Sequence, residues 1–284
     1  AMGVEFFDNT IKSVEQIERR GLSILSIIPA IGAIAGRNSS KKKYAKKNAN
    51  VEKLQRRLIT HEDPKSPVSE AYRGLRTSLM YTVNKEKCNI ILVSSAGPGE
   101  GKTTTIANLA ITYANLGKKT LLVDSDLRKP VLHNVFKIDK SPGLTSFLSG
   151  ISEVKDIISK SDIENLDIIP SGVIPPNPSE LLDSELMQKF IDTVKHQYDV
   201  VLFDSPPLIA VTDSYIILKY ITQFILVVRS GVSERGGLDR VLKTLNQSNL
   251  PLTGIVLNAM TEENSYGAGY YYNYYQYYYE EGEK

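Results

Sequence analysis

The chain alternates between short apolar runs and longer segments in which apolar residues recur every three or four positions. The short runs predict six buried strands, over residues 90–94, 120–123, 166–169, 200–203, 224–228 and 254–257. The longer segments predict helices over residues 103–116, 179–195, 213–220 and 234–247. Apolar strands alternating with helices are typical of a parallel sheet covered on both faces. The expected fold class is α/β, with a mostly parallel β-sheet flanked by helices on both faces.

A glycine-rich loop follows the first of these strands and leads into the first of these helices. It reads Ala96-Gly97-Pro98-Gly99-Glu100-Gly101-Lys102-Thr103-Thr104, with Ala96 where the strict pattern has glycine. In a strand–loop–helix setting, such a loop cradles phosphate groups with its backbone N–H groups and the positive end of the helix. We expect Lys102 to reach the β- and γ-phosphates and the Thr103 hydroxyl to bind Mg²⁺. The loop predicts a P-loop NTPase-like fold with ATP and Mg²⁺ as cofactors.

Three aspartates follow two other apolar runs. Asp124 and Asp126 end the run at 121–126, and Asp204 ends the run at 200–204. Because the carboxyl ends of parallel strands meet at one edge of a sheet, we expect all three near the phosphate loop. A single aspartate would more readily indicate a helix cap or a turn. Three of them on a phosphate-loop chain favour metal binding and acid/base catalysis.

Nine of the 16 tyrosines lie in the fourteen residues 266–279, near the end of the chain. They are Tyr266, Tyr270, Tyr271, Tyr272, Tyr274, Tyr275, Tyr277, Tyr278 and Tyr279. No core buries so many phenols in so short a stretch, because each hydroxyl needs its own partner. We therefore expect the tail to lie in water and to be the substrate of the phosphate-handling site. The alternative is a low-complexity aromatic tail without chemistry.

Glu70, Arg73 and Arg76 are spaced i, i+3, i+6 in a segment with helical character. On a helix this spacing places them within about 120° of arc, on one face. Such a face can form ion pairs with a neighbouring subunit, or it is a solvent-exposed charged face.

Composition excludes several classes of protein. The net charge of +2 argues against a nucleic-acid partner. Cys88, as a single cysteine, cannot form an internal disulfide, which fits a reducing compartment, and the scattered histidines His61, His133 and His196 suggest no metal cluster.

Residues 22–35 are apolar but too short to span a membrane, which takes about 20 residues. A basic run follows them and favours an anionic membrane surface or a solvated linker; it comprises Arg37, Lys41, Lys42, Lys43, Lys46, Lys47, Lys53, Arg56 and Arg57.

The motifs together resemble a known family. Residues 96–104, 124–128 and 203–207 resemble the Walker A, Walker A′ and Walker B motifs of bacterial tyrosine kinases. These are autokinases of polysaccharide assembly that share ancestry with partition and septum-site ATPases. The run at 174–182 and the tyrosine-rich tail are also similar to that family. The partition-type relatives carry a signature lysine where this chain has Gly97.

The resemblance implies an ATP- and Mg²⁺-dependent protein tyrosine autokinase that phosphorylates its own tail between subunits and regulates capsular or exopolysaccharide synthesis and export. Lys102, Asp124, Asp126 and Asp204 would be catalytic. Asp124 would orient or deprotonate the tyrosine hydroxyl, and Asp126 and Asp204 would hold Mg²⁺ with Thr103. The nucleotide would contact Asn258, for which a turn role is the alternative, and the loop residues Gly97, Pro98, Gly99, Glu100, Gly101, Lys102, Thr103 and Thr104.

The resemblance also implies partners. Glu70, Arg73 and Arg76 would assemble a homo-oligomeric ring, an octamer in the family. A transmembrane polysaccharide co-polymerase or adaptor and a protein tyrosine phosphatase would act with it at the cytoplasmic face of the bacterial membrane.

The first residues have a character of their own. Residues 6–18 and 25–29 resemble the cytoplasmic end of chain-length-determinant membrane proteins, and a capping box at Ser13 predicts a short helix through Arg20. The chain would thus comprise an adaptor-like segment (1–35), a basic linker (36–62), a P-loop tyrosine kinase domain (63–262) and a tyrosine-rich tail without ordered structure (263–284). It would be the cytosolic part of a longer membrane kinase, or an adaptor tail fused to its kinase.

Two other functions stay open from the residues alone. One is a partition-type ATPase switch, against which Gly97 and the tyrosine tail both count. The other is a non-catalytic adaptor that binds nucleotide and uses its aromatic tail for interactions.

Overall fold

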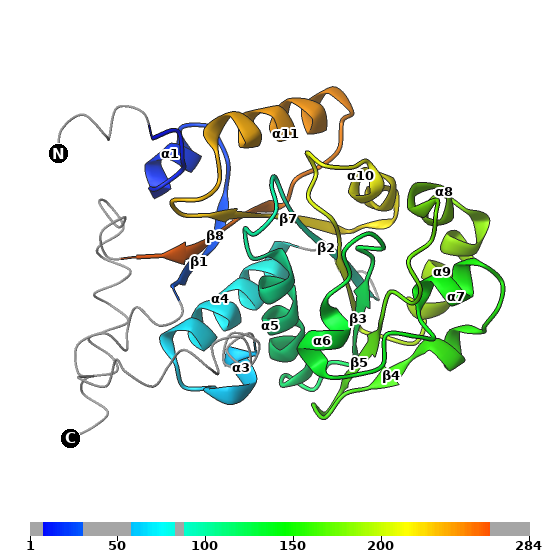
Figure 1. The fold of residues 1–284 in the computed structure, drawn as a ribbon. Helices are drawn as coiled ribbons and strands as arrows, with labels where there is room; N and C mark the ends of the chain where they lie inside the picture. The colour runs from blue at the N-terminus through cyan, green and yellow to red at the C-terminus, as the bar shows by residue number, and fades with distance from the viewer. Residues whose placement is uncertain (1–7, 31–57, 83–87, 262–284) are drawn as a thin grey trace, which may run out of the picture.

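A single eight-stranded sheet organises the chain (Figure 1). The computed structural model describes residues 8–30, 58–82 and 88–261. The strand order is β1-β8-β7-β2-β6-β3-β5-β4, and every neighbouring pair is parallel except β4 with β5. The tyrosine cluster and the basic run lie outside the described residues, so what the sequence predicts for them stays a prediction.

All six predicted strands are present, and the predicted fold class is confirmed. Their bounds are β2 Asn89–Ser95, β3 Thr120–Asp124, β5 Leu166–Ile169, β6 Val200–Asp204, β7 Gln223–Arg229 and β8 Gly254–Met260. The residues of β3, β5 and β6 are all buried, which explains why these strands are mostly apolar rather than alternating, although β5 includes the buried Asp167. Two strands were not predicted, β1 (Ile24–Pro29) and the two-residue β4 (Ser159–Lys160).

Helices cover both faces of the sheet and divide the core in two. One half packs against α1, α7, α8, α9, α10 and α11, and the other against α3, α4, α5 and α6. The helices of the first half are α1 Val14–Glu18, α7 Leu144–Leu148, α8 Pro178–Leu182, α9 Glu185–Val194, α10 Asp213–Ile217 and α11 Arg235–Gln247. Those of the second half are α3 Ile59–Glu62, α4 Pro67–Thr82, α5 Lys102–Ala114 and α6 Leu132–Phe136. The described residues also form two 3₁₀ turns, η2 Val154–Ile157 and η3 Leu218–Tyr220.

The helix predicted over residues 179–195 is interrupted. It forms as α8 and α9, with the break at Ser184, whose hydroxyl oxygen accepts a hydrogen bond from the Met187 N–H. A serine in this position satisfies a free N–H of the first turn and so starts a new helix. The apolar period runs through the break, because both helices bury residues against the same half of the core.

The N-terminal segment belongs to the sheet. Strand β1 lies parallel to β8, and Ile11, Ile17 and Ile28 are fully buried. Most of β1 is only half-buried, and it lies within the apolar residues 22–35, which are too short for a membrane span. Pro29 is tolerated because β1 is an edge strand. The predicted short helix forms as α1 but ends at Glu18 rather than Arg20, and the predicted capping box does not form. The Ser13 side chain makes no capping hydrogen bond, and Gln16 Oε1 accepts from the N–H of Lys12 (2.8 Å) rather than of Ser13.

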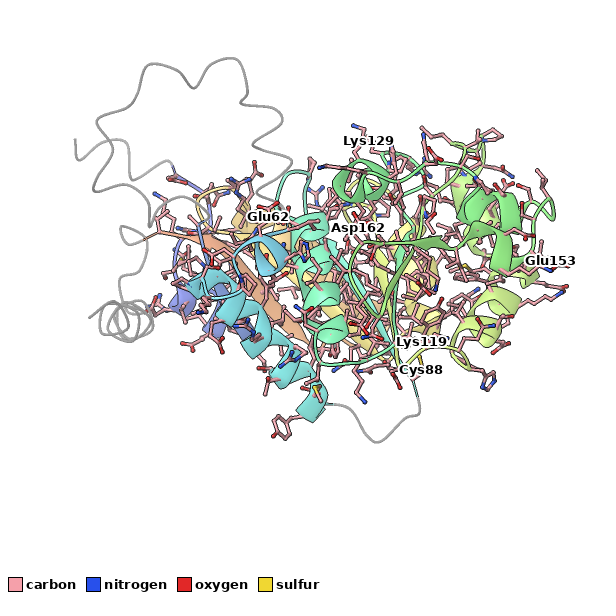
Figure 2. All side chains as sticks on the ribbon, turned by 90° about the horizontal axis from the view of Figure 1, so that it is seen from below. Glu62, Cys88, Lys119, Lys129, Glu153 and Asp162 are labelled. Atoms are coloured by element: carbon pink, nitrogen blue, oxygen red, sulfur yellow. The ribbon has the colours of Figure 1, made fainter. Side chains whose placement is uncertain are left out.

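Figure 2 shows the two sides of the sheet at which the strands begin and end. In this view Cys88 and Lys119, which directly precede β2 and β3, lie on one side of the molecule, and Lys129, which follows β3, lies on the opposite side. The carboxyl ends of the central strands therefore face the side of Lys129. Within the described ranges, no helix combines the length and the apolar character that a membrane span requires.

We predict that residues 8–30 contribute to the stability of the whole domain. Replacing the fully buried Ile28 by alanine should lower the free energy of unfolding by about 2–4 kcal/mol, because it removes packed methyl groups and leaves a cavity. Chemical denaturation measures this change. The control is Ile151→Ala at a side chain that is 80% exposed, which should stay within about 0.5 kcal/mol of the parent. Equal stabilities of the two variants would contradict the packing of this segment.

Candidate nucleotide and phosphoryl-transfer site

The glycine-rich loop connects β2 to α5 at the carboxyl edge of the sheet. Gly99 and Gly101 have positive φ angles, +76° and +98°, which glycine adopts without strain. Gly101 also has no room for a side chain, because a Cβ there would lie 2.1 Å from Asn258 Nδ2. The φ angle of this position thus favours glycine, and any larger residue would also have to displace the Asn258 side chain.

Neighbouring strands hold the loop in place. Asn258 Nδ2 donates to the Glu100 carbonyl (2.9 Å), and Arg229 Nη1 donates to the Gly99 carbonyl (2.9 Å). Inside the loop, Glu100 Oε1 accepts from the Gly97 N–H at 3.0 Å. Asn258 therefore lies against the phosphate loop, as a nucleotide-binding residue should, and its contact with adenine stays a prediction.

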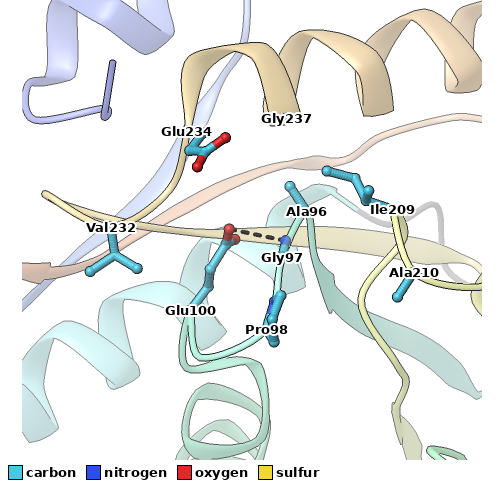
Figure 3. A pocket seen from close by; sticks show the side chains of 9 residues that line it. All are labelled: Ala96, Gly97, Pro98, Glu100, Ile209, Ala210, Val232, Glu234 and Gly237. Atoms are coloured by element: carbon cyan, nitrogen blue, oxygen red, sulfur yellow. Dashed lines mark hydrogen bonds between the residues drawn. The ribbon is translucent and has the colours of Figure 1, made fainter. Parts of the chain in front are cut away.

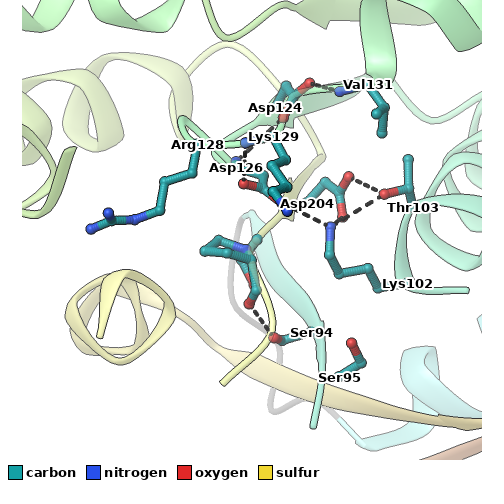
Figure 4. A network of polar contacts seen from close by, with 12 residues as sticks. Ser94, Ser95, Lys102, Thr103, Asp124, Asp126, Arg128, Lys129, Val131 and Asp204 are labelled. Carbon is teal, nitrogen blue, oxygen red and sulfur yellow. Dashed lines mark hydrogen bonds and ion pairs between the residues drawn. The ribbon is translucent and has the colours of Figure 1, made fainter. Parts of the chain in front are cut away.

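The four predicted catalytic residues are brought together by the fold (Figure 4). Lys102 Nζ lies 3.2 Å from Asp126 Oδ2 and 3.4 Å from Asp204 Oδ1. Asp124 and Asp204 occupy paired positions on the neighbouring strands β3 and β6. Thr103 Oγ1 donates to Asp204 Oδ2 at 2.6 Å. Residues from three distant stretches of sequence thus form one charged cluster at the carboxyl edge.

Burial shapes the charges of this cluster. Burial raises the pKa of Asp124 to about 8, and the charge of Asp204 adds to the effect. Burial also raises the pKa of Asp204, although Lys102 and the Thr103 hydroxyl act in the opposite direction. Burial by itself would lower the pKa of Lys102, but Asp204 and Asp126 outweigh it, so the pKa is raised. Lys102 consequently stays positively charged in a site suited to phosphate groups.

The two aspartates of the Asp-x-Asp-x-Arg motif have different surroundings. Asp124 Oδ2 accepts from the N–H groups of Val131 (3.2 Å) and Leu132 (3.1 Å), so this carboxylate orders the turn between β3 and α6. Asp126 presents Oδ2 to Lys102, while its Oδ1 accepts from the Lys129 N–H at 2.9 Å. Asp126 and Asp204 therefore flank the lysine directly. The division of roles between Asp124 and Asp126 stays a prediction.

Arg128 completes a polar bridge that the sequence did not assign to the site. Its guanidinium contacts both oxygens of Asp213, with Nε–Oδ2 at 2.8 Å and Nη2–Oδ1 at 3.1 Å. Ser179 donates to the same carboxylate at 2.7 Å. The bridge fastens the turn after β3 to the starts of α8 and α10. The motif marks Arg128 in the sequence, but no pattern indicates Asp213, which lies 85 residues away.

The donor set fits Mg²⁺ held through a nucleotide. Within the described residues, no group of three or more His, Cys, Asp or Glu side chains has the arrangement of a metal cage. Thr103, Asp126 and Asp204 offer hard oxygen atoms beside a phosphate loop, and Thr103 already touches Asp204. Mg²⁺ prefers one or two carboxylates together with substrate phosphates over a cage built only of protein.

The charged face predicted on α4 makes contacts within the chain. Glu70 Oε2 lies 2.7 Å from Arg73 Nη1, and Arg76 Nη1 donates to the Thr112 carbonyl at 2.7 Å. The Nε atom of Arg76 is buried and has no hydrogen-bond partner among the described residues. Glu70 and Arg73 keep more than a third of their side-chain surface exposed. Some polar groups of this face are thus hydrogen-bonded within the chain, and others remain accessible to a partner.

Comparison with known proteins assigns the chain to a family. Residues 88–252 match the family described as an AAA domain. The tyrosine-protein kinase YwqD of Bacillus subtilis is 38% identical over 219 residues, which make up 77% of this chain and 92% of YwqD. The chain is a member of the bacterial tyrosine-protein kinase family. The resemblance and the enzyme class inferred from the sequence are confirmed.

Some relatives in the family are much longer than this chain. Tyrosine-protein kinase Wzc of Salmonella typhimurium is 32% identical over 279 residues, which are 98% of this chain but 38% of Wzc. Among solved structures, the chimerical protein CapA2B2 matches with a TM-score of 0.75 and 36% identity, over 87% of this chain and 99% of that chain. The septum site-determining protein MinD of Pyrococcus horikoshii, complexed with Mg-ADP, has a TM-score of 0.52 and 28% identity, over 60% and 70%.

We predict that Gly101→Ala weakens nucleotide binding by at least about tenfold, because the new Cβ collides with Asn258 and distorts the loop. Titration with a fluorescent ATP analogue measures the affinity. Gly117→Ala is the matched control, since Gly117 also has a positive φ, +78°, but nothing lies within 4 Å of its Cβ position. It should retain the nucleotide affinity of the parent. An unchanged affinity of Gly101→Ala would show that this glycine is not required.

Proposed function

We propose that this kinase transfers the γ-phosphoryl group of Mg²⁺-ATP to tyrosines of its own C-terminal cluster, 266–279. The observation that carries the proposal is Lys102, which lies on a phosphate loop between Asp126 and Asp204. The tail supplies the acceptors. The 24 residues after Met260 can extend to about 80 Å, far enough to reach their own site or that of a neighbouring subunit.

The transfer step follows from this arrangement. The phenol oxygen attacks the γ-phosphorus, the bond from this phosphorus to the bridging oxygen breaks, and ADP leaves with the electron pair. Lys102 and the N–H groups of the loop stabilise the charge that develops on the phosphoryl oxygens. Asp124 takes the phenol proton when it is ionised. Its raised pKa makes the ionised form a stronger base than an ordinary carboxylate but leaves the group largely protonated near neutral pH. Mg²⁺, held by Thr103, Asp126 and Asp204, would neutralise charge on the β- and γ-phosphates.

We predict that the purified chain, incubated with ATP and Mg²⁺, gains phosphotyrosine within residues 266–279, and that Lys102→Met loses it. Peptide mass spectrometry maps the modified tyrosines. Asp124→Asn should still bind ATP but transfer at least about 100-fold more slowly, because it cannot accept the proton. Lys119→Met removes the same charge at the opposite edge of the sheet and serves as the control (Figure 2).

The same assay separates the two other functions considered from the sequence. A partition-type ATPase switch would release phosphate without forming phosphotyrosine. A non-catalytic adaptor would bind ATP and leave it intact. Near-normal autophosphorylation of Lys102→Met would overturn the assignment of the site.

We further propose that the chain assembles into a homo-oligomeric ring through Glu70, Arg73 and Arg76, so that each tail reaches the neighbouring subunit. An interface on this face is supported by Glu70 and Arg73, which keep more than a third of their side-chain surface exposed, and by Nε of Arg76, which has no hydrogen-bond partner among the described residues. The triple alanine variant should be monomeric by light scattering and should still bind ATP, because the face lies apart from the phosphate loop. An unchanged mass would remove these residues from the interface.

The wider setting is also part of the proposal. Each phosphotyrosine adds a charge of about −1.5 to −2, so phosphorylated tails would repel one another and favour the monomer. A phosphatase would restore the ring. Such a cycle, at the cytoplasmic face of the membrane and with a transmembrane adaptor, would regulate the synthesis and export of capsular or exopolysaccharide. The similarity to part of the longer Wzc and to most of the CapA2B2 chimera supports the adaptor.

A further inference from the structure

A pocket of about 310 Å³ lies between the phosphate loop and the N-terminal end of α11 (Figure 3). The loop forms one wall with Pro98 and Glu100, the segment after β6 forms the second with Ile209 and Ala210, and the approach to α11 supplies Val232. Gly97, Pro98 and Glu100 belong to the loop expected to bind the nucleotide, whereas Ile209, Ala210 and Val232 have no part in the transfer described above.

The walls of the pocket are fixed to the phosphate loop by backbone hydrogen bonds. The Ile209 N–H donates to the Ala96 carbonyl (3.2 Å), and the Leu208 N–H donates to the Ser95 carbonyl (2.9 Å). Leu208 and Ile209 follow Asp204 closely in the chain. A molecule in the pocket therefore lies beside the elements that carry Lys102 and Asp204.

The pocket has open apolar walls. The side chains of Ile209 and Val232 are 42% and 46% exposed, although both are large and apolar. At the start of α11, Gly237 leaves space, and a Cβ there would approach Ile209 Cδ1 to 3.2 Å. Glycine inside a helix costs about 1 kcal/mol relative to alanine, so this opening is kept at the expense of stability. A flat, apolar ring fits such a slot.

Two carboxylates of the pocket determine which charge an occupant can carry. Glu234 is exposed at the pocket, and Glu100 is 4% exposed in its wall. Glu100 Oε1 accepts from the Gly97 N–H, but Oε2 has no partner among the described residues. Burial raises the pKa of Glu100 to about 7. The raised pKa leaves Glu100 only partly charged near neutral pH, so it is the exposed Glu234 that offers an accessible hydrogen-bond acceptor and a charge that repels anions such as phosphate groups.

We propose that this pocket binds the phenol ring of an unphosphorylated tyrosine from the 266–279 cluster of a second copy of this chain. The ring packs between Pro98, Ile209 and Val232, and its hydroxyl donates to a carboxylate. Among the residue types of the tail, tyrosine alone combines a flat apolar ring with a neutral donor. Phosphorylation replaces the donor with an anion, so a finished tyrosine leaves and another takes its place.

This inference rests on the proposed transfer between subunits. Tail tyrosines follow one another at intervals of one to four residues, so a docked ring holds the next one within about 14 Å along the chain. The pocket would then keep the acceptor segment at the carboxyl edge while successive tyrosines reach Lys102.

A mixing experiment with two full-length chains tests the pocket. The enzyme chain has serine at all nine tail tyrosines, and the substrate chain carries Lys102→Met with its tail intact. Val232→Trp or, independently, Ala210→Phe in the enzyme chain fills the pocket and should reduce transfer to the substrate chain by at least about tenfold, as loss of a buried aromatic anchor does. The affinity for a fluorescent ATP analogue and the unfolding midpoint should be unchanged. Ile151→Trp, at an exposed position outside the pocket, is the control.

The same substitutions in the substrate chain show whether transfer requires the pocket of the enzyme chain or that of the substrate chain. There they should have no effect. Normal transfer by both filled enzyme chains, or an effect only in the substrate chain, would overturn the proposal. Absence of transfer by the enzyme chain without a pocket substitution would instead refute the proposed function itself.

A second measurement tests the charge. A peptide of residues 264–284 should inhibit the transfer, and its fully phosphorylated form should inhibit at least about tenfold less. Glu234→Lys in the enzyme chain should reduce this difference between the two peptides. Equal inhibition by both peptides would contradict the selection for the unphosphorylated phenol, and inhibition by a lysine-rich peptide of equal length with the same strength would show a general cation site.

Discussion

Two buried carboxylates lie at paired positions on adjacent parallel strands, Asp124 on β3 and Asp204 on β6. The register of the sheet fixes their proximity, and like charges so close in a buried site are unfavourable unless a cation compensates them. Lys102 is that cation, and it comes from the loop after a third strand. Removing one partner from a buried group of charges costs about 3–5 kcal/mol of folding free energy. The loop, the two strands and the turn after β3 are therefore energetically coupled.

The N-terminal segment is also connected to the phosphate loop, through the loop that follows β7. The Ile11 N–H donates to the Ser233 carbonyl, and the Gly231 N–H donates to the Ile11 carbonyl, both at 2.8 Å. The loop that they hold follows Arg229, which donates to the Gly99 carbonyl of the phosphate loop. A continuous path of hydrogen bonds, the last of them from the Arg229 side chain, therefore connects an adaptor-like stretch of sequence to the groups expected around the nucleotide.

Much of the fold could be predicted because strong local signals agree with it. The phosphate loop, the strand-end aspartates and the six central strands all follow from unbroken apolar runs and short motifs. Strand β1 escaped prediction because it lies inside the longer apolar stretch 22–35, in which Pro29 argues against a strand. Asp213 escaped because its partner Arg128 is distant in sequence, and burial of a lone aspartate has no local signature. The break at Ser184 escaped because one apolar period continues through both helices.

The position of β1 at the end of the sheet has a consequence for any shortened form of the protein. A chain cut at the boundary that the sequence suggests, near residue 63, would lack β1 and leave β8 as the outermost strand beyond β7. The N–H and C=O groups of β8 that now pair with β1 would then face outward in a row flanked by buried apolar side chains such as Ile255 and Leu257. Such an edge is a template for intermolecular strand pairing, so the shortened form would tend to aggregate.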